Sequence, residues 1–158
     1  KEKIMAKAKD IMTTEIVTVL PETPIVEAAQ LLIDSHYNGL PVVDEGGRLT
    51  GIICQDDLIF QQKKIPLPSF FTVLDGLIPL SSDKNIEKEV RKIAAATVEN
   101  AMTPDPITVS PEARIEEIAT LMIKHDIHTL PVLDQGILVG IIGKEDILKT
   151  LVPLGESA

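Results

Sequence analysis

The pattern of apolar positions predicts a strand and then a helix near the start of the chain. Ile16 to Leu20 is an apolar, β-branched run that Pro21 ends, which is typical of a strand. The next apolar side chains recur at the spacing of a single helix face. They are Ile25, Ala28, Ala29, Leu32 and Ile33. We therefore expect a strand over 16–20, followed by an amphipathic helix.

Two more strands and a second helix are predicted downstream. The runs 40–44 and 49–54 are apolar and of strand length, and the turn residues Glu45-Gly46-Gly47 separate them. A helix is predicted over 56–61, because the acidic residues at its start suit the helix dipole. The elements follow the order β-α-β-β-α.

The same plan occurs a second time along the chain. Met12-Thr13 corresponds to Met102-Thr103, and Leu40-Pro41-Val42 corresponds to Leu130-Pro131-Val132, in both cases 90 positions later. The helical spacing of 25–33 also recurs over 115–123. An internal repeat of this kind predicts two copies of one structural unit.

The spacing between the copies changes by one residue at the hairpin turn. Beyond it, Gly51 corresponds to Gly140 and Asp57 to Asp146, an offset of 89. The second copy turns at Gln135-Gly136, returns over 137–142 and begins its last helix near Lys144. We place the first unit at 9–61 and the second at 98–152.

A segment of different character, 62–97, separates the two units. Pro66 and Pro68 break it from the preceding helix. Apolar residues over 70–78 predict a short amphipathic helix, and the cap residues of 81–83 predict the start of another. Two interpretations stay open: a helical pair that packs on the repeats, or a surface for a dimer or another partner.

Composition narrows the class of protein. The 158 residues are 44% apolar, which allows a substantial core, and only 3% aromatic. The formal net charge of −9 argues against a nucleic-acid surface. The single cysteine, Cys54, forms no intrachain disulfide and fits a reducing, cytoplasmic compartment. Neither an apolar run of membrane-spanning length nor a signal peptide is recognised, so we expect no membrane insertion.

No pattern of catalytic or metal-ligating residues stands out. His125 and His128 lack a partner at ligand spacing, and Cys54 lies in a predicted buried strand, where an inert thiol is expected. Phosphate loops and hydrolase motifs are not found. We therefore expect a binding module rather than an enzyme, with neither catalytic residues nor a metal site.

The repeated residues resemble the cystathionine β-synthase (CBS) domain family, whose tandem pairs are called Bateman modules. The resemblance rests on the Met-Thr pairs, on Leu40–Asp44 and Leu130–Asp134, and on Gly51…Asp57 and Gly140…Asp146. It implies an α/β (α+β) fold in which two β-α-β-β-α motifs pack as a pseudo-twofold pair, with the helical insert between them. It also implies clefts for AMP, ADP, ATP or S-adenosylmethionine, a homodimer and a regulated protein partner.

The resemblance carries site residues over to this chain. Asp57 and Asp146 match the position that accepts hydrogen bonds from ribose hydroxyls, which suits a carboxylate because it has only acceptors. The alternative is an acid that only stabilises the start of a helix. Apolar walls for adenine are implied, together with backbone groups that read the base. These residues are Ile16, Val17, Asn38, Gly39, Leu40, Pro41, Ile107, His128, Thr129, Leu130 and Pro131. Most of them are also ordinary core positions.

Phosphate requires cations or clustered N–H donors. The family often places a basic group where this chain has Asn38 and His128, and Lys144 is a further cation. The Thr or Ser expected three residues before each aspartate is replaced by Cys54 and Gly143. On this basis the first site keeps Thr23 with Asn38, and the second keeps His128 with Lys144.

Two functions follow from these features. One is a sensor that binds an adenosyl ligand and regulates a partner. The alternative is a ligand-free structural or dimerisation scaffold, which the incomplete phosphate positions and the Phe-bearing insert favour.

Overall fold

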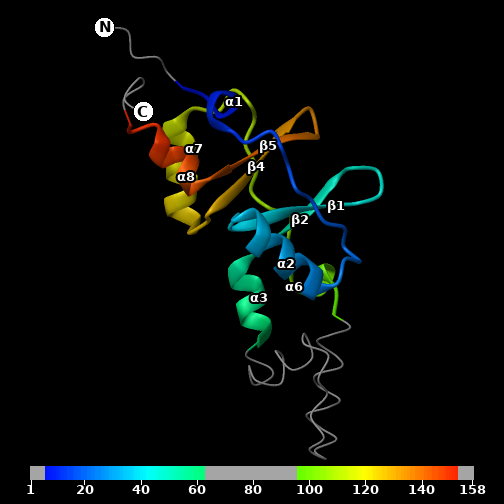
Figure 1. Cartoon of the computed structure of the whole chain (residues 1–158). Helices are drawn as coiled ribbons and strands as arrows, with labels where there is room; N and C mark the ends of the chain where they lie inside the picture. The colour runs from blue at the N-terminus through cyan, green and yellow to red at the C-terminus, as the bar shows by residue number, and fades with distance from the viewer. Residues whose placement is uncertain (1–5, 63–95, 153–158) are drawn as a thin grey trace, which may run out of the picture.

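Each repeat forms a two-stranded hairpin flanked by helices, as Figure 1 shows for the computed structural model, which describes residues 6–62 and 96–152. In the first repeat the order is α2 (Ile25–Ser35), β1 (Gly39–Val43), β2 (Leu49–Cys54) and α3 (Gln55–Gln62). In the second it is α7 (Ile115–His125), β4 (Thr129–Asp134), β5 (Ile137–Gly143) and α8 (Lys144–Lys149). The predicted mixed α/β fold with two copies of one unit is confirmed.

The two hairpins share one register. Gly39 lies opposite Cys54 in the first hairpin, and Thr129 lies opposite Gly143 in the second. The second turn is tighter, with Gln135 and Gly136 at φ values of 50° and 84°. Such a two-residue turn with positive φ suits the twist of a hairpin, so the one-residue change in spacing lies at the turn, as predicted.

The segment before each repeat packs against the other repeat. Helix α1 (Ala8–Ile11) lies beside the second repeat, and α6 (Val98–Ala101) lies beside α2 of the first (Figure 1). The N–H of Ala8 donates to the Ala113 carbonyl at 2.8 Å, and the N–H of Val98 donates to the Thr23 carbonyl at 2.8 Å. The two repeats are therefore interleaved around a pseudo-twofold axis.

Two methionine–glycine contacts continue this exchange. Thr13 pairs with Ile141 of β5, and the short strand β3 (Thr103–Pro104) pairs with β2. Met12 consequently lies on Gly140, and Met102 lies on Gly51, each with no room for a Cβ atom. Glycine at these positions allows the crossing segment to approach the hairpin.

Each repeat has its own core, completed by one residue from the exchanged segment. The first core contains Val19, Ala28, Leu32, Leu40, Val42, Ile53 and Val98. The second contains Ala8, Val109, Ala113, Ile118, Met122, Leu130, Val132 and Ile142. Full burial of one such aliphatic side chain contributes about 1.5–3 kcal/mol, so these clusters are the main source of stability.

The predicted strand over 16–20 is wrong. Only Val19 pairs, in parallel with Val42, and the same holds for Val109 and Val132. The N–H of Val19 donates to the Pro41 carbonyl, and the N–H of Val43 donates to the Val19 carbonyl. Extending this ladder toward Val17 would require a donor at Pro41, which has no N–H. The proline therefore limits the pairing to a single bridge.

The apolar helix faces are only partly buried. Ile25, Ala28 and Leu32 are buried, but Ile33 keeps 66% of its surface exposed and the equivalent Ile123 keeps 82%. The spacing correctly identified the helices, but Ile33 and Ile123, which it placed on their apolar faces, remain largely exposed.

The predicted helices of the insert lie outside the described residues, and the unit limits 9–61, 62–97 and 98–152 stay a prediction. Within the described part of the chain, the helices are all too short or too polar to cross a membrane.

Candidate functional site

The two predicted ribose-binding aspartates occupy equivalent places in the first turn of α3 and α8. Asp57 Oδ2 accepts the Cys54 N–H at 2.8 Å, and Asp146 Oδ2 accepts the Gly143 N–H at 2.8 Å. The second oxygen of each carboxylate has no hydrogen-bond donor among the described residues. Each aspartate therefore caps the start of its helix with one carboxylate oxygen, and its other oxygen is free to accept a hydrogen bond.

Asp57 faces a cavity of about 250 Å³ that both repeats build, here named the Asp57 cleft. The first repeat supplies the end of β2 and the start of α3. The second supplies the segment around β3 and the residues between α7 and β4. The lining residues are Ile52, Cys54, Asp56, Asp57, Thr103, Asp105, Pro106, Ile107, Asp126, Ile127, His128 and Thr129.

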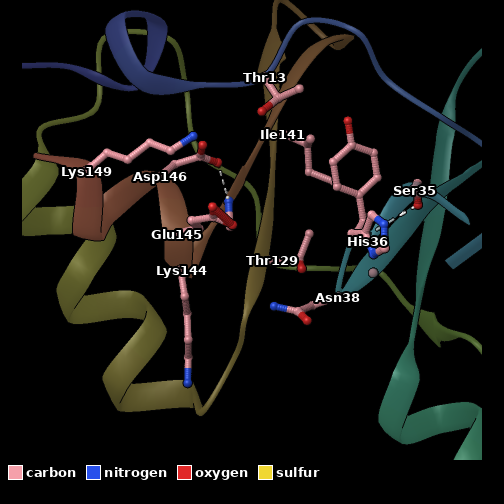
Figure 2. Close-up of a pocket in the computed structure, with 13 residues that line it drawn as sticks. Thr13, Ser35, His36, Asn38, Thr129, Ile141, Lys144, Glu145, Asp146 and Lys149 are labelled. Atoms are coloured by element: carbon pink, nitrogen blue, oxygen red, sulfur yellow. Dashed lines mark hydrogen bonds between the residues drawn. The ribbon is translucent and has the colours of Figure 1, made fainter. Parts of the chain in front are cut away.

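Asp146 faces a second cavity of about 190 Å³, here named the Asp146 cleft (Figure 2). Figure 2 shows Lys144 and Asp146 of α8 on one side of this cavity. Ser35 and His36, at the end of α2, lie on the opposite side. The lining residues are Thr13, Ser35, His36, Tyr37, Asn38, Gly39, Thr129, Ile141, Gly143, Lys144, Glu145, Asp146 and Lys149.

The two clefts are built from the same repeat positions with the repeats exchanged. The Asp57 cleft contains Cys54, Asp56 and Asp57, and the Asp146 cleft contains the equivalent Gly143, Glu145 and Asp146. Likewise Asp126, Ile127 and His128 correspond to His36, Tyr37 and Asn38. Both volumes are below the roughly 300–1,000 Å³ of most ligand pockets, so a bound nucleoside would stay partly exposed to solvent.

A third cavity of about 160 Å³ lies between the clefts. It is lined by Asn38, Cys54, Gln55, Asp56 and His128. Asn38 and His128, the equivalent residues of the two repeats, thus meet at the same central opening. Polar groups from both repeats converge where the clefts come closest.

Burial raises the pKa of two groups that line the Asp57 cleft. It raises the pKa of the Asp57 carboxyl, while the Cys54 N–H acts in the opposite direction and Asp56 adds to the increase. Burial also raises the pKa of the Cys54 thiol to about 12, with a further increase from Asp57 and Asp56. Cys54 is therefore a protonated thiol at neutral pH, which agrees with the expectation that it is not a nucleophile.

Unusual backbone conformations gather at the clefts. His36 and Asp126 end the two equivalent helices with φ values of 60° and 51°, and Asp105 has a φ of 48°. Non-glycine residues adopt this left-handed region rarely. All three line a cleft, so the local fold directs these polar residues to the edges of the two cavities.

In the described residues, no cluster of three or more His, Cys, Asp or Glu side chains could hold a metal ion.

The predicted site residues divide into two groups. Several lie together in the clefts: Asp57 with Ile107, His128 and Thr129, and Asp146 with Asn38, Gly39 and Lys144. Others line none of the clefts described above. Leu40, Pro41, Leu130 and Pro131 are fully buried, Val17 packs against the first core, and Ile16 is not a lining residue of these cavities. The Thr23 hydroxyl accepts the Leu20 N–H at 2.9 Å within a local turn.

The predicted grouping of the phosphate residues was wrong. His128 lies with Asp57 rather than with Lys144, and Lys144 lies with Asn38. The error came from assigning each site to one repeat. Because the segments before the repeats are exchanged, each aspartate faces the residues that precede the middle strand of the other repeat.

Sequence reasoning also missed several lining residues. The main ones are Thr13, His36, Tyr37 and Lys149 in one cleft, and Asp56, Thr103, Asp105 and Asp126 in the other. The repeat alignment held the signal, since it pairs Thr13 with Thr103 and His36 with Asp126.

The comparisons with known proteins agree with this geometry. The sequence model of the CBS domain matches residues 8–64 and 98–153. The chain is similar to the protein YhcV of Bacillus subtilis, a CBS domain-containing protein, with 30% identity over 90% of this chain and 84% of the relative. It is also similar to the protein MJ1426 of Methanocaldococcus jannaschii, with 29% identity over 91% of this chain and 90% of the relative.

Solved structures of CBS pairs share the fold. CBSX2 of Arabidopsis thaliana, solved in complex with AMP, is similar in structure with a TM-score of 0.68 and 26% identity. The match covers 92% of this chain and 95% of that one. The CBS pair of protein MJ0100, in complex with 5'-methylthioadenosine and S-adenosyl-L-methionine, gives a TM-score of 0.68 and 28% identity, covering 93% and 96%. With two matched copies over most of its length and the interleaved pair seen here, this chain belongs to the CBS domain family.

Proposed function

We propose that this chain is a regulatory module that binds an adenosyl ligand, such as AMP, ADP, ATP or S-adenosylmethionine, in the clefts between its two repeats. The observation that carries the proposal is the pair of aspartates, Asp57 and Asp146, each with one oxygen committed to a helix start and one free. A carboxylate held in this way is ready to accept hydrogen bonds from a ribose diol without rearranging.

The rest of each cleft suits a nucleoside. In the Asp57 cleft, Ile52, Ile107 and Ile127 offer apolar contacts for a base beside the polar carboxylates. In the Asp146 cleft, Tyr37 and Ile141 take this role. Apolar walls with a few polar groups are the usual composition of a site for a small organic ligand, and the Asp57 cleft matches it more closely than the Asp146 cleft, whose lining is mostly polar. CBSX2 with AMP, and the MJ0100 CBS pair with methylthioadenosine and S-adenosylmethionine, are similar in fold and support this class of ligand.

Regulation would arise because each cleft has walls from both repeats. A ligand that contacts both walls stabilises one relative arrangement of the repeats by its differential affinity for it. Thr13 and Thr103 line the clefts and belong to the exchanged segments. A change at a cleft would therefore be passed to α1 and α6 and onward to a protein partner.

The single cysteine, Cys54, supports placing the module in the cytoplasm.

Thermal unfolding with and without ligand tests this proposal. AMP, ADP, ATP, S-adenosylmethionine and adenosine are each added at 100-fold the dissociation constant, where binding stabilises the fold by about 2.7 kcal/mol. For a chain of this size, the melting temperature should rise by about 5–10 °C. Asp57→Asn and Asp146→Asn together should remove the shift. An unchanged shift in the double variant would place the ligand elsewhere.

A second function, a homodimeric scaffold, is favoured by exposed aliphatic side chains at equivalent positions of the repeats. Ile33 and Ile59 are 66% and 60% exposed, and the equivalent Ile123 and Leu148 are 82% and 60% exposed. Ile123 and Leu148 border a shallow apolar groove between α7 and α8. A surface with this repetition suits a symmetric partner of the same chain.

The oligomeric state distinguishes the two functions. Light scattering coupled to gel filtration should give a dimer, and Ile33→Glu with Ile123→Glu should give a folded monomer. A dimer that responds to none of the five compounds would favour the scaffold alone. A monomeric wild type at micromolar concentration would exclude it.

A further inference from the structure

The two clefts differ in charge at positions that the repeat makes equivalent. Asp126 borders the Asp57 cleft where His36 borders the Asp146 cleft. Gln55, at the start of α3, is replaced by Lys144 at the start of α8. Because the clefts are built from equivalent repeat positions, these two substitutions make them differ in charge.

The Asp57 cleft is lined by acids. Asp56, Asp57, Asp105 and Asp126 all border it, and its lining contains neither lysine nor arginine. His128 is the one basic side chain among the lining residues. At neutral pH the carboxylates oppose the entry of an anion by direct repulsion.

The Asp146 cleft balances its acids with cations. Lys144 and Lys149 offset Glu145 and Asp146, and His36 adds a further nitrogen donor. Both lysines belong to α8 of the second repeat, whereas His36, at the end of α2, brings its ring nitrogens from the first repeat. The two lysine side chains carry no salt bridge to a described residue, which leaves their ammonium groups available to a ligand.

A nucleotide would respond strongly to this difference. A phosphate monoester carries about 1.5–2 negative charges at pH 7. We propose that the Asp146 cleft takes the adenosyl ligand that carries a phosphate, whereas the Asp57 cleft accepts only adenosyl compounds without one. This inference rests on the proposed function, and assigns a different class of ligand to each of the two clefts.

Titration calorimetry of the full chain with AMP and with adenosine tests the assignment. AMP should bind one site per chain; Asp146→Asn should abolish that binding and Asp57→Asn should retain it. The Asn side chain keeps an oxygen for the helix start, so both variants should fold, which circular dichroism checks. Lys144→Gln, which copies the equivalent Gln55, should lower the affinity for AMP relative to adenosine on the order of tenfold.

A reciprocal change tests the same idea by gain of binding. Asp126→Asn in the lining of the Asp57 cleft, with Gln55→Lys beside its lining residues Asp56 and Asp57, makes this region two charges more positive. Asn tolerates the left-handed backbone at position 126. AMP should then bind two sites per chain. The matched control is Glu45→Gln with Glu22→Gln, which changes the net charge equally but lies outside both clefts, and it should leave one AMP site.

The outcomes separate the inference from the proposed function. AMP binding that is lost in Asp57→Asn and kept in Asp146→Asn would overturn the charge assignment while leaving an adenosyl-binding module. Two equal AMP sites in the wild type would do the same. If none of AMP, ADP, ATP, S-adenosylmethionine and adenosine binds, the proposed function itself fails and the assignment fails with it.

Discussion

The methionine–glycine contacts that interleave the repeats can be tested by adding one methyl group. A Cβ atom at Gly51 would lie 2.6 Å from Met102 Sδ and 2.8 Å from the carbonyl oxygen of Thr103. A Cβ atom at Gly140 would overlap Met12, at 2.7 Å from Cγ and 3.0 Å from Cβ. Overpacking of this kind costs about 1–3 kcal/mol.

The two glycines differ in what could move aside. At Gly140 the three nearest atoms all belong to the Met12 side chain, whereas at Gly51 one is the backbone oxygen of Thr103. Met12→Ala should therefore remove most of the cost of Gly140→Ala. Met102→Ala should remove less of the cost of Gly51→Ala, because the backbone of β3 stays in place.

Two double-mutant cycles in urea measure both coupling energies. Each single glycine variant should lose about 2 kcal/mol, or about 6 °C in melting temperature. Gly46→Ala serves as the control, since its added Cβ would meet nothing closer than Asp44 Oδ1 at 3.4 Å. A glycine variant as stable as the wild type would refute the close crossing of the repeats.

Three further predictions concern single side chains. Asp57→Ala should lower the free energy of unfolding by about 1 kcal/mol, because it removes the hydrogen bond from the Cys54 N–H at the start of α3. Asp57→Asn keeps an acceptor oxygen and should restore most of this stability. Equal losses for both variants in chemical denaturation would contradict this role. Burial raises the pKa of Asp57, so the folded state disfavours its ionised form and loses stability as the pH rises through that pKa. The stability of Asp57→Asn relative to the wild type should therefore increase from pH 3 to pH 7, and a difference independent of pH would argue against the raised pKa. Because burial raises the pKa of Cys54 to about 12, iodoacetamide should modify it at pH 8 far more slowly than a free thiol, and a rate equal to that of glutathione would contradict its burial.

Much of the fold could be predicted from the sequence because the determining features are local. The apolar spacing over 25–33 identifies α2, and the glycine-containing turns define the hairpins. The strand over 16–20 failed for a reason that is not local to it. Its partner carries Pro41 at the position where the next donor would be needed.

The clefts were harder to predict because they depend on the exchange of segments between repeats. The alignment identified Asp57, Asp146, Asn38 and His128, but it could not show which repeat each of them faces. The structure shows it: Asp57 lines a cleft with residues 126–129 of the second repeat, and Asp146 lines one with residues 35–39 of the first. Long-range pairing of this kind leaves no periodic signal in the sequence.

The central claim is that an adenosyl ligand binds between the two repeats, at the free oxygen of an aspartate. A crystal structure of the chain grown with AMP is the measurement that tests it. We expect a ribose whose hydroxyls donate to Asp146, with the phosphate near Lys144. A structure with AMP bound away from both aspartates, or with none bound at saturating concentration, would contradict it.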